Sequence, residues 1–97
     1  MNDMNSVYLV GRLVANPKTK NGLITFTLAN NNYMYDKRKK EYVAKTIFFN
    51  VEISLNYLPD VKGSIKKGIR VGVNGFLAEN GIIHAVTIQI LDKGVKE

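Results

Sequence analysis

Five short runs in which apolar and polar residues alternate dominate this chain of 97 residues. They occupy residues 6–13, 24–30, 46–54, 70–77 and 82–91. Successive side chains of a β-strand point to opposite faces, so alternation rich in β-branched and aromatic residues predicts strands with one buried face. The chain is short enough that we expect residues 1–97 to form a single domain.

The alternation also predicts which side chains face the core. The inward-facing set is Val7, Leu9, Leu13, Ile24, Phe26, Leu28, Ile47, Phe49, Val51, Ile53, Val71, Val73, Leu77, Val86, Ile88 and Ile90.

The segments between the runs predict their connections. Asn80 and Gly81 form the dipeptide favoured in a tight type I′ hairpin, because both central residues need positive φ. Residues 58–68 carry apolar residues three and four apart, which predicts a short helix between the third and fourth strands. An all-β fold of five strands with one helix at this point is typical of the OB-fold, a partly open Greek-key barrel. An SH3-like barrel is the alternative, although it does not require that helix.

Composition excludes several classes of function. The chain has no cysteine, which excludes disulfides and thiol catalysis, and its single histidine, His84, is too few for a zinc site of the usual kind. No catalytic set is recognisable, so we expect neither an enzyme nor a cofactor. No apolar run is long enough to cross a membrane and no secretory signal is evident, so we expect a cytoplasmic, nucleoid-associated protein.

The charge balance favours a polyanionic partner. Fourteen Lys and Arg residues oppose eight Asp and Glu residues, giving a net charge of +6. Residues 30–42 read "NNNYMYDKRKKEY", which mixes aromatic and basic side chains and offers little to a core. A solvated hairpin tip and a nuclear-type import signal are the alternatives. The interleaved aromatics favour nucleic acid, because a groove that binds single strands combines cations for phosphates with aromatic faces for bases.

Two phenylalanines also interrupt the expected pattern. Phe48 follows Ile47 and precedes Phe49, so the alternation turns it away from the core, to the face of Asn50 and Glu52. An exposed phenylalanine within a strand indicates a base-stacking surface, and packing under a loop or in a subunit interface is the alternative. Phe76 has the same position in the fourth run, and contact with the helix or a partner subunit is the stronger alternative for it.

Three motifs resemble the bacterial single-stranded DNA-binding proteins (SSB) over nearly the whole chain. "MNSVYLVGRLVANP" (4–17) resembles the opening of that family, "FTLAN" (26–30) resembles its Phe-x-Leu-Ala, and "KKGIRVGVNGFL" (66–77) resembles its Lys-Gly-x-x-Val-x-Val-x-Gly-x-Leu. The resemblance implies an OB-fold that binds single-stranded DNA as a homodimer or homotetramer, often by pairing the first strands. It also implies that Phe48 is a base-stacking residue.

The sequence departs from the family at several positions. Met34 stands where the family often has an aromatic, so Tyr33 or Tyr35 is the expected substitute, and Ser54 stands where the family often has Phe. The connection "AENGI" (78–82) is short, and the chain ends in "KGVKE" in place of an acidic tail. If the chain is complete, recruitment of repair and replication proteins through such a tail should be absent. The dimeric primosomal replication protein is similar in these respects.

We therefore expect non-specific binding of single-stranded DNA in replication, recombination or repair. The candidate binding residues are Phe48, Tyr33, Met34, Tyr35, Tyr42, Lys37, Arg38, Lys39, Lys40 and Lys45, with Arg12, Lys20, Arg70 and Phe76 as secondary candidates. The alternatives are a primosome-type module that binds a helicase or primase, and an RNA-binding OB protein. No metal site or membrane partner is expected.

Overall fold

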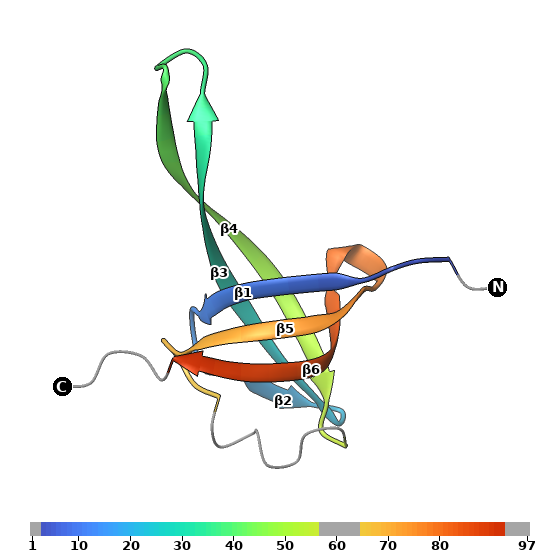
Figure 1. Ribbon diagram of the computed structural model, residues 1–97. Helices are drawn as coiled ribbons and strands as arrows, with labels where there is room; N and C mark the ends of the chain where they lie inside the picture. The colour runs from blue at the N-terminus through green and yellow to red at the C-terminus, as the bar shows by residue number, and fades with distance from the viewer. Residues whose placement is uncertain (1–2, 57–64, 93–97) are drawn as a thin grey trace.

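The computed structural model describes residues 3–56 and 65–92, and most of these lie in one six-stranded sheet (Figure 1). The elements are β1 (Val7–Leu13), β2 (Lys18–Lys20), β3 (Leu23–Asp36), β4 (Glu41–Ser54), β5 (Arg70–Leu77), the 3-10 turn η1 (Glu79–Gly81) and β6 (Ile83–Asp92). The five predicted strands are all present, and β2 is an additional short strand. Within the described ranges, no helix is long and apolar enough to cross a membrane.

The sheet closes into a barrel. Its strand order is β1-β5-β6-β4-β3-β2, and β1 also pairs with β3 through Arg12 and Leu13. The β4–β6 pair is parallel, and the other pairs are antiparallel. A barrel of this kind is the OB-fold, as the order of the elements predicted.

Gly11 allows the closure between β1 and β3. A Cβ atom at this position would lie 2.7 Å from the carbonyl oxygen of Ala29, a separation that real Cβ atoms essentially never show. Only glycine fits this approach of two backbones without a shift of one strand.

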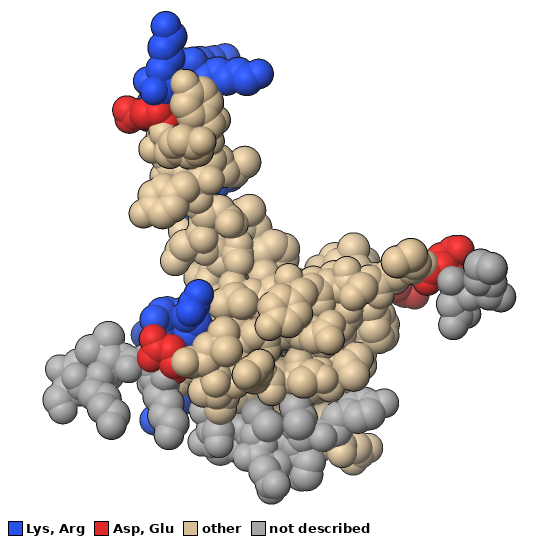
Figure 2. All heavy atoms as spheres, viewed as in Figure 1, with Lys and Arg blue, Asp and Glu red and all other residues tan. Residues whose placement is uncertain are grey.

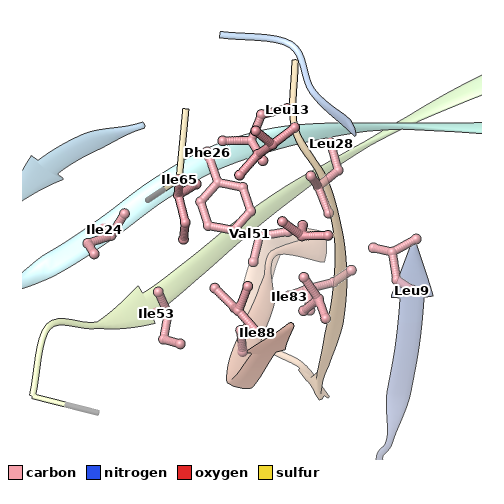
Figure 3. Close-up of a cluster of buried hydrophobic side chains, with 14 residues drawn as sticks. Leu9, Leu13, Ile24, Phe26, Leu28, Val51, Ile53, Ile65, Ile83 and Ile88 are labelled. Carbon is pink, nitrogen blue, oxygen red and sulfur yellow. The ribbon is translucent and has the colours of Figure 1, made fainter. Parts of the chain in front are cut away.

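The core fills the barrel with aliphatic side chains and one phenylalanine (Figure 3). Most of the predicted inward-facing residues of the first four runs are buried. These are Leu9, Leu13, Ile24, Phe26, Leu28, Val51, Ile53, Val71 and Val73. Burial of each large side chain contributes roughly 1.5–3 kcal/mol relative to leaving it exposed, so alternation in these strands accounts for most of the barrel's apolar stabilisation.

The predicted inward face of β6 is wrong at Val86, which is half exposed at 50%. Asn74 pairs with Thr87 and Gly75 with Ala85, so Val86 is skipped in the register. Such a β-bulge reverses the alternation along the strand. Ile83 and Ala85 are therefore buried before the bulge, and Ile88 after it.

Of the other predicted core residues, Val7 and Phe49 are half-buried and pack against the core, whereas three more are exposed at the ends of the barrel. Leu77 is the last residue of β5, Ile90 lies near the end of β6, and Ile47 lies where β4 leaves the barrel. These side chains extend past the neighbours that would cover them, so alternation alone overestimates the core there.

The connections agree with the sequence where they are described. Asn80 and Gly81 have φ values of 63° and 74°, and the amide of Ile82 donates to the carbonyl oxygen of Glu79 at 3.3 Å, as a type I′ turn requires. The helix predicted over 58–68 falls largely outside the described residues, and no helix is present at 65–68. Ile65, from its apolar stripe, is buried in the core.

Strands β3 and β4 continue beyond the barrel as a two-stranded ribbon (Figure 1). Each has 14 residues, and their pairing is unbroken from Leu23 opposite Ser54 to Asp36 opposite Glu41. We call residues 30–47 the arm. The predicted strands, 24–30 and 46–54, covered only the part of this hairpin that has a buried face.

Candidate nucleic-acid interface

The register of β3 and β4 divides the aromatic residues between the two sides of the ribbon. Directly opposed residues share a side, and the side alternates along each strand. Phe48 lies opposite Ala29, Tyr33 opposite Ala44, and Tyr35 opposite Tyr42. Phe48 and the three tyrosines therefore share one side, which we call the stacking side.

All four rings on the stacking side are open to solvent. Phe48 is 63% exposed and Tyr33 is 77% exposed, and neither belongs to the core. Tyr35 and Tyr42 meet edge to face, with ring centroids 5.3 Å apart. The prediction that Phe48 points away from the core is confirmed, and its flat faces are available to a ligand.

Met34 and Lys45 lie on the opposite side of the arm. Met34 is paired with Val43, and Lys45 with Asn32. The structure thus separates Met34 from Phe48 and brings Tyr33 and Tyr35 to the side of Phe48. That one of these tyrosines stacks a base in place of residue 34 stays a prediction.

The tip of the arm displays four consecutive basic residues. Asp36 accepts hydrogen bonds at Oδ1 from the backbone amides of Arg38 and Lys39, at 2.8 and 3.2 Å. The amide of Lys40, with a φ of 55°, donates to the carbonyl oxygen of Asp36 at 2.7 Å. These bonds shape the turn through the backbone and leave the cationic side chains exposed.

Positive charge is concentrated at this tip. Figure 2 shows Lys and Arg side chains gathered there, above a shaft that is largely uncharged in this view. None of the four cations from Lys37 to Lys40 pairs with a carboxylate in the part of the chain that the structure describes. They are therefore free to bind phosphates.

A cavity of about 400 Å³ continues the stacking side toward the other end of the barrel. Thr25, Thr27, Asn50 and Glu52 form its floor together with core atoms, and residues 14–16, Lys18 and Ile82 form its walls. The cavity thus lies between the first loop and the β5–β6 connection, which is where OB-folds bind oligonucleotides.

Hydrogen bonds fix the polar groups of this cavity. The hydroxyl of Thr27 donates to Oδ1 of Asn50 at 2.9 Å. Nδ1 of His84 lies 2.9 Å from Oε2 of Glu52, and the ring of Phe76 packs on His84 at 5.1 Å between centroids. Phe76 is therefore connected to the interface through His84 and Glu52, at the end opposite the arm.

Sequence reasoning did not select Lys18, Asn50 or Glu52 as site residues. The signal was present for two of them, because Asn50 and Glu52 have the same parity as Phe48 along β4. Lys18 lies in β2, a strand that the alternation did not predict, and it pairs with Thr25 of β3.

The secondary cationic candidates lie in different surroundings. Arg12 and Arg70 line a hollow of about 360 Å³ at the root of the arm, together with Ala29 and its neighbours. Arg12 is already engaged, because its guanidinium donates to Asp92 at 2.9 Å and to the carbonyl oxygen of Gly68 at 3.0 Å. Lys20 lies opposite Leu23, at the end of β3 farthest from the tip.

No group of three or more His, Asp or Glu residues that could hold a metal ion occurs in residues 3–56 or 65–92. The described residues instead present aromatic rings and a polar cavity on one side of one sheet, with cations at the tip of the arm. Rings together with cations are the combination that single-strand binders use.

Comparison with protein families identifies the family of the chain. The sequence pattern of the Single-strand binding protein family matches residues 4–83. The chain belongs to this family. The resemblance found in the three sequence motifs is confirmed. A search of curated proteins found no match.

Solved structures of SSB proteins share the fold. The Plasmodium falciparum SSB, in a complex with single-stranded DNA, aligns with a TM-score of 0.77 and 24% identity over 95% of this chain and 98% of its own. The small single-stranded DNA-binding protein of Streptomyces coelicolor aligns with a TM-score of 0.71 and 24% identity over 94% and 95%. A deletion mutant of the single-stranded DNA binding protein from Thermus aquaticus aligns with a TM-score of 0.77 and 20% identity, over 92% of this chain and 51% of its own.

Proposed function

We propose that this SSB-family protein binds single-stranded DNA with little sequence specificity and catalyses no reaction. The observation that carries the proposal is the stacking side, where Phe48 and three exposed tyrosines share one side of a ribbon that ends in four free cations. Family membership supports it, as does the similar P. falciparum SSB, whose structure is a complex with single-stranded DNA.

The proposed mechanism has two parts. Bases stack on the exposed rings, each worth about 1–3 kcal/mol, without regard to sequence because every base has a π-face. The tip, from Lys37 to Lys40, neutralises phosphates and releases the cations condensed on the strand. Lys18 at the cavity and Arg70 at the root of the arm extend this path along the barrel.

We propose that the protein acts as a homodimer or homotetramer. The edge of β1 from Val7 to Gly11 that faces away from β5 has no strand partner among the described residues. Tyr8 is 70% exposed there, and the surface over β1, β5 and β6 is mostly uncharged in Figure 2. Light scattering on the wild type and on Val10→Lys tests this. We expect a dimer or tetramer mass for the wild type and a lower mass for the variant, and a monomeric wild type would refute the proposal.

We further propose a cytoplasmic role in DNA replication, recombination or repair. A gel shift at physiological salt with single-stranded DNA, double-stranded DNA and RNA of matched sequence tests the central claim. We expect single-stranded DNA to bind most tightly. Loss of that preference would favour an RNA-binding role or a module for a helicase or primase.

A further inference from the structure

The cavity between residues 14–16, Lys18 and Ile82 contains a feature that general stacking does not explain. Among the described residues that line it, Glu52 is the only carboxylate and Lys18 is the only other charged residue. A carboxylate beside a bound polyanion weakens binding by repulsion. Glu52 already contacts His84 through Oε2, so what its position in the cavity favours is a neutral group that donates further hydrogen bonds, rather than a phosphate.

The two polar groups on the cavity floor are oriented and complementary. Oε2 of Glu52 lies within hydrogen-bond distance of Nδ1 of His84. Oε1 and further lone pairs of Oε2 have no partner in the described structure. Asn50 receives the Thr27 hydroxyl at Oδ1, so its Nδ2 is left to donate. The floor thus offers two acceptor oxygens next to one donor.

Their spacing fits one base. Asn50 and Glu52 are two residues apart on the same side of β4, which places their Cβ atoms about 7 Å apart. A cavity of about 400 Å³ falls in the size range of small-ligand pockets. Val14 and Ile82 supply apolar contact for a ring inserted between them.

We propose that this cavity is a guanine-selective subsite in an otherwise sequence-tolerant interface. This inference rests on the proposed function and narrows it. The hydrogen-bonding edge of guanine presents the N2 amino group and N1–H as adjacent donors, followed by the O6 acceptor. Glu52 accepts from the two donors, and Nδ2 of Asn50 donates to O6. Thymine presents one donor between two acceptors, which places a carbonyl against the carboxylate.

The test is competition among single strands of about 12 nucleotides, within the site size of one OB domain. The strands are oligo-dT and alternating dT with dG, dA or dI, measured in lithium chloride to avoid four-stranded guanine structures. A bidentate contact discriminates by about 1–3 kcal/mol, so we expect dG strands to bind roughly 5- to 150-fold more tightly than dA or dT strands. Inosine lacks the N2 amino group and should bind less tightly than guanosine.

Glu52→Gln identifies the residue responsible. The variant should lose the preference for dG and bind oligo-dT more tightly, because a negative charge leaves the interface. Glu79→Gln is the matched control, since it makes the same charge change in η1 without lining the cavity. It should keep the preference. Thr27→Val removes the hydrogen bond that orients Asn50, so it should reduce the ratio of the affinity for dG strands to that for oligo-dT. This variant provides the test if Glu52→Gln does not fold.

Two results would overturn the inference. One is wild-type protein that binds oligo-dT well and dG strands no better. The other is a dG preference that survives in both folded Glu52→Gln and Thr27→Val. Failure to bind any single strand would instead refute the proposed function, so the two claims fail separately.

Discussion

The rings of Tyr35 and Tyr42 meet edge to face across the arm, at 5.3 Å between centroids and 73° between planes. They lie directly opposite each other on a ribbon whose residues contribute nothing to the buried core. Isolated two-stranded hairpins are marginally stable, and a cross-strand pair of this kind contributes about 0.2–1 kcal/mol. The contact therefore orders the arm and presents part of the stacking side at the same time.

Replacing one of these rings should loosen the arm and leave the barrel intact. We expect Tyr35→Ala to raise amide hydrogen exchange in residues 30–47 and to weaken binding of oligo-dT. The barrel's melting temperature should stay the same, because its core lies elsewhere. A large drop in that temperature would contradict the separation of arm and barrel.

Phe48→Ala should weaken binding of single strands by about 1–3 kcal/mol, the range for one stacked base. The free energy of unfolding should change little, because the ring is mostly exposed. Titration calorimetry and chemical denaturation measure the two effects. Phe48→Trp is the control that retains a flat face and should bind at least as well as wild type. Equal affinity of the alanine variant would place Phe48 outside the interface.

The two sides of the arm can be compared with neighbouring residues. Tyr33→Ala removes a ring from the stacking side, whereas Met34→Ala removes a side chain of similar length from the opposite side. We expect the tyrosine variant to lose roughly 1–3 kcal/mol of binding free energy and the methionine variant much less. Fluorescence anisotropy with labelled oligo-dT provides the measurement. A larger loss of affinity in the methionine variant would mean that the strand binds on the Met34 side of the arm.

The basic tip should determine much of the salt dependence. For single strands, the logarithm of the association constant falls with the logarithm of salt concentration with a slope of about −0.7 per phosphate neutralised. Changing Lys37, Arg38, Lys39 and Lys40 to glutamine should make that slope shallower by about 0.7 for each phosphate that the tip no longer binds, for all sequences alike. An unchanged slope would show that the tip does not touch phosphates.

Gly11 and Gly72 provide a matched test of the barrel closure. A Cβ at Gly11 would collide with the Ala29 backbone at 2.7 Å, whereas one at Gly72 would meet the Tyr8 hydroxyl at an ordinary 3.5 Å. We expect Gly11→Ala to cost about 1–3 kcal/mol, as overpacking does, and Gly72→Ala to cost much less. Urea denaturation measures both. Similar stability of the two variants would mean that β1 can shift without destabilising the barrel.

Much of the barrel could be predicted because alternation reports burial directly. The positions of Leu9, Phe26 and Val51 follow from a period of two, and the fold follows from the order of the elements. Val86 could not be predicted, because a bulge is set by the neighbouring strand and leaves no mark in the local pattern.

Less of the candidate site could be predicted from the sequence. Phe48 was found because an apolar residue on the outer face breaks the pattern. The length of the arm was missed because neither side of it is buried, so hydrophobicity does not alternate there. Glu52 and Asn50 were missed because a polar residue on an outer face is ordinary until the cavity around it is known.

The arm has a consequence for how this protein can change over time. Of the fourteen buried core side chains found in residues 3–56 and 65–92, none lies in residues 30–47. Substitutions, insertions or added charge in the arm therefore act on affinity with little effect on foldability. Selection and engineering can thus adjust how strongly the protein holds its ligand without consuming the stability margin of the domain.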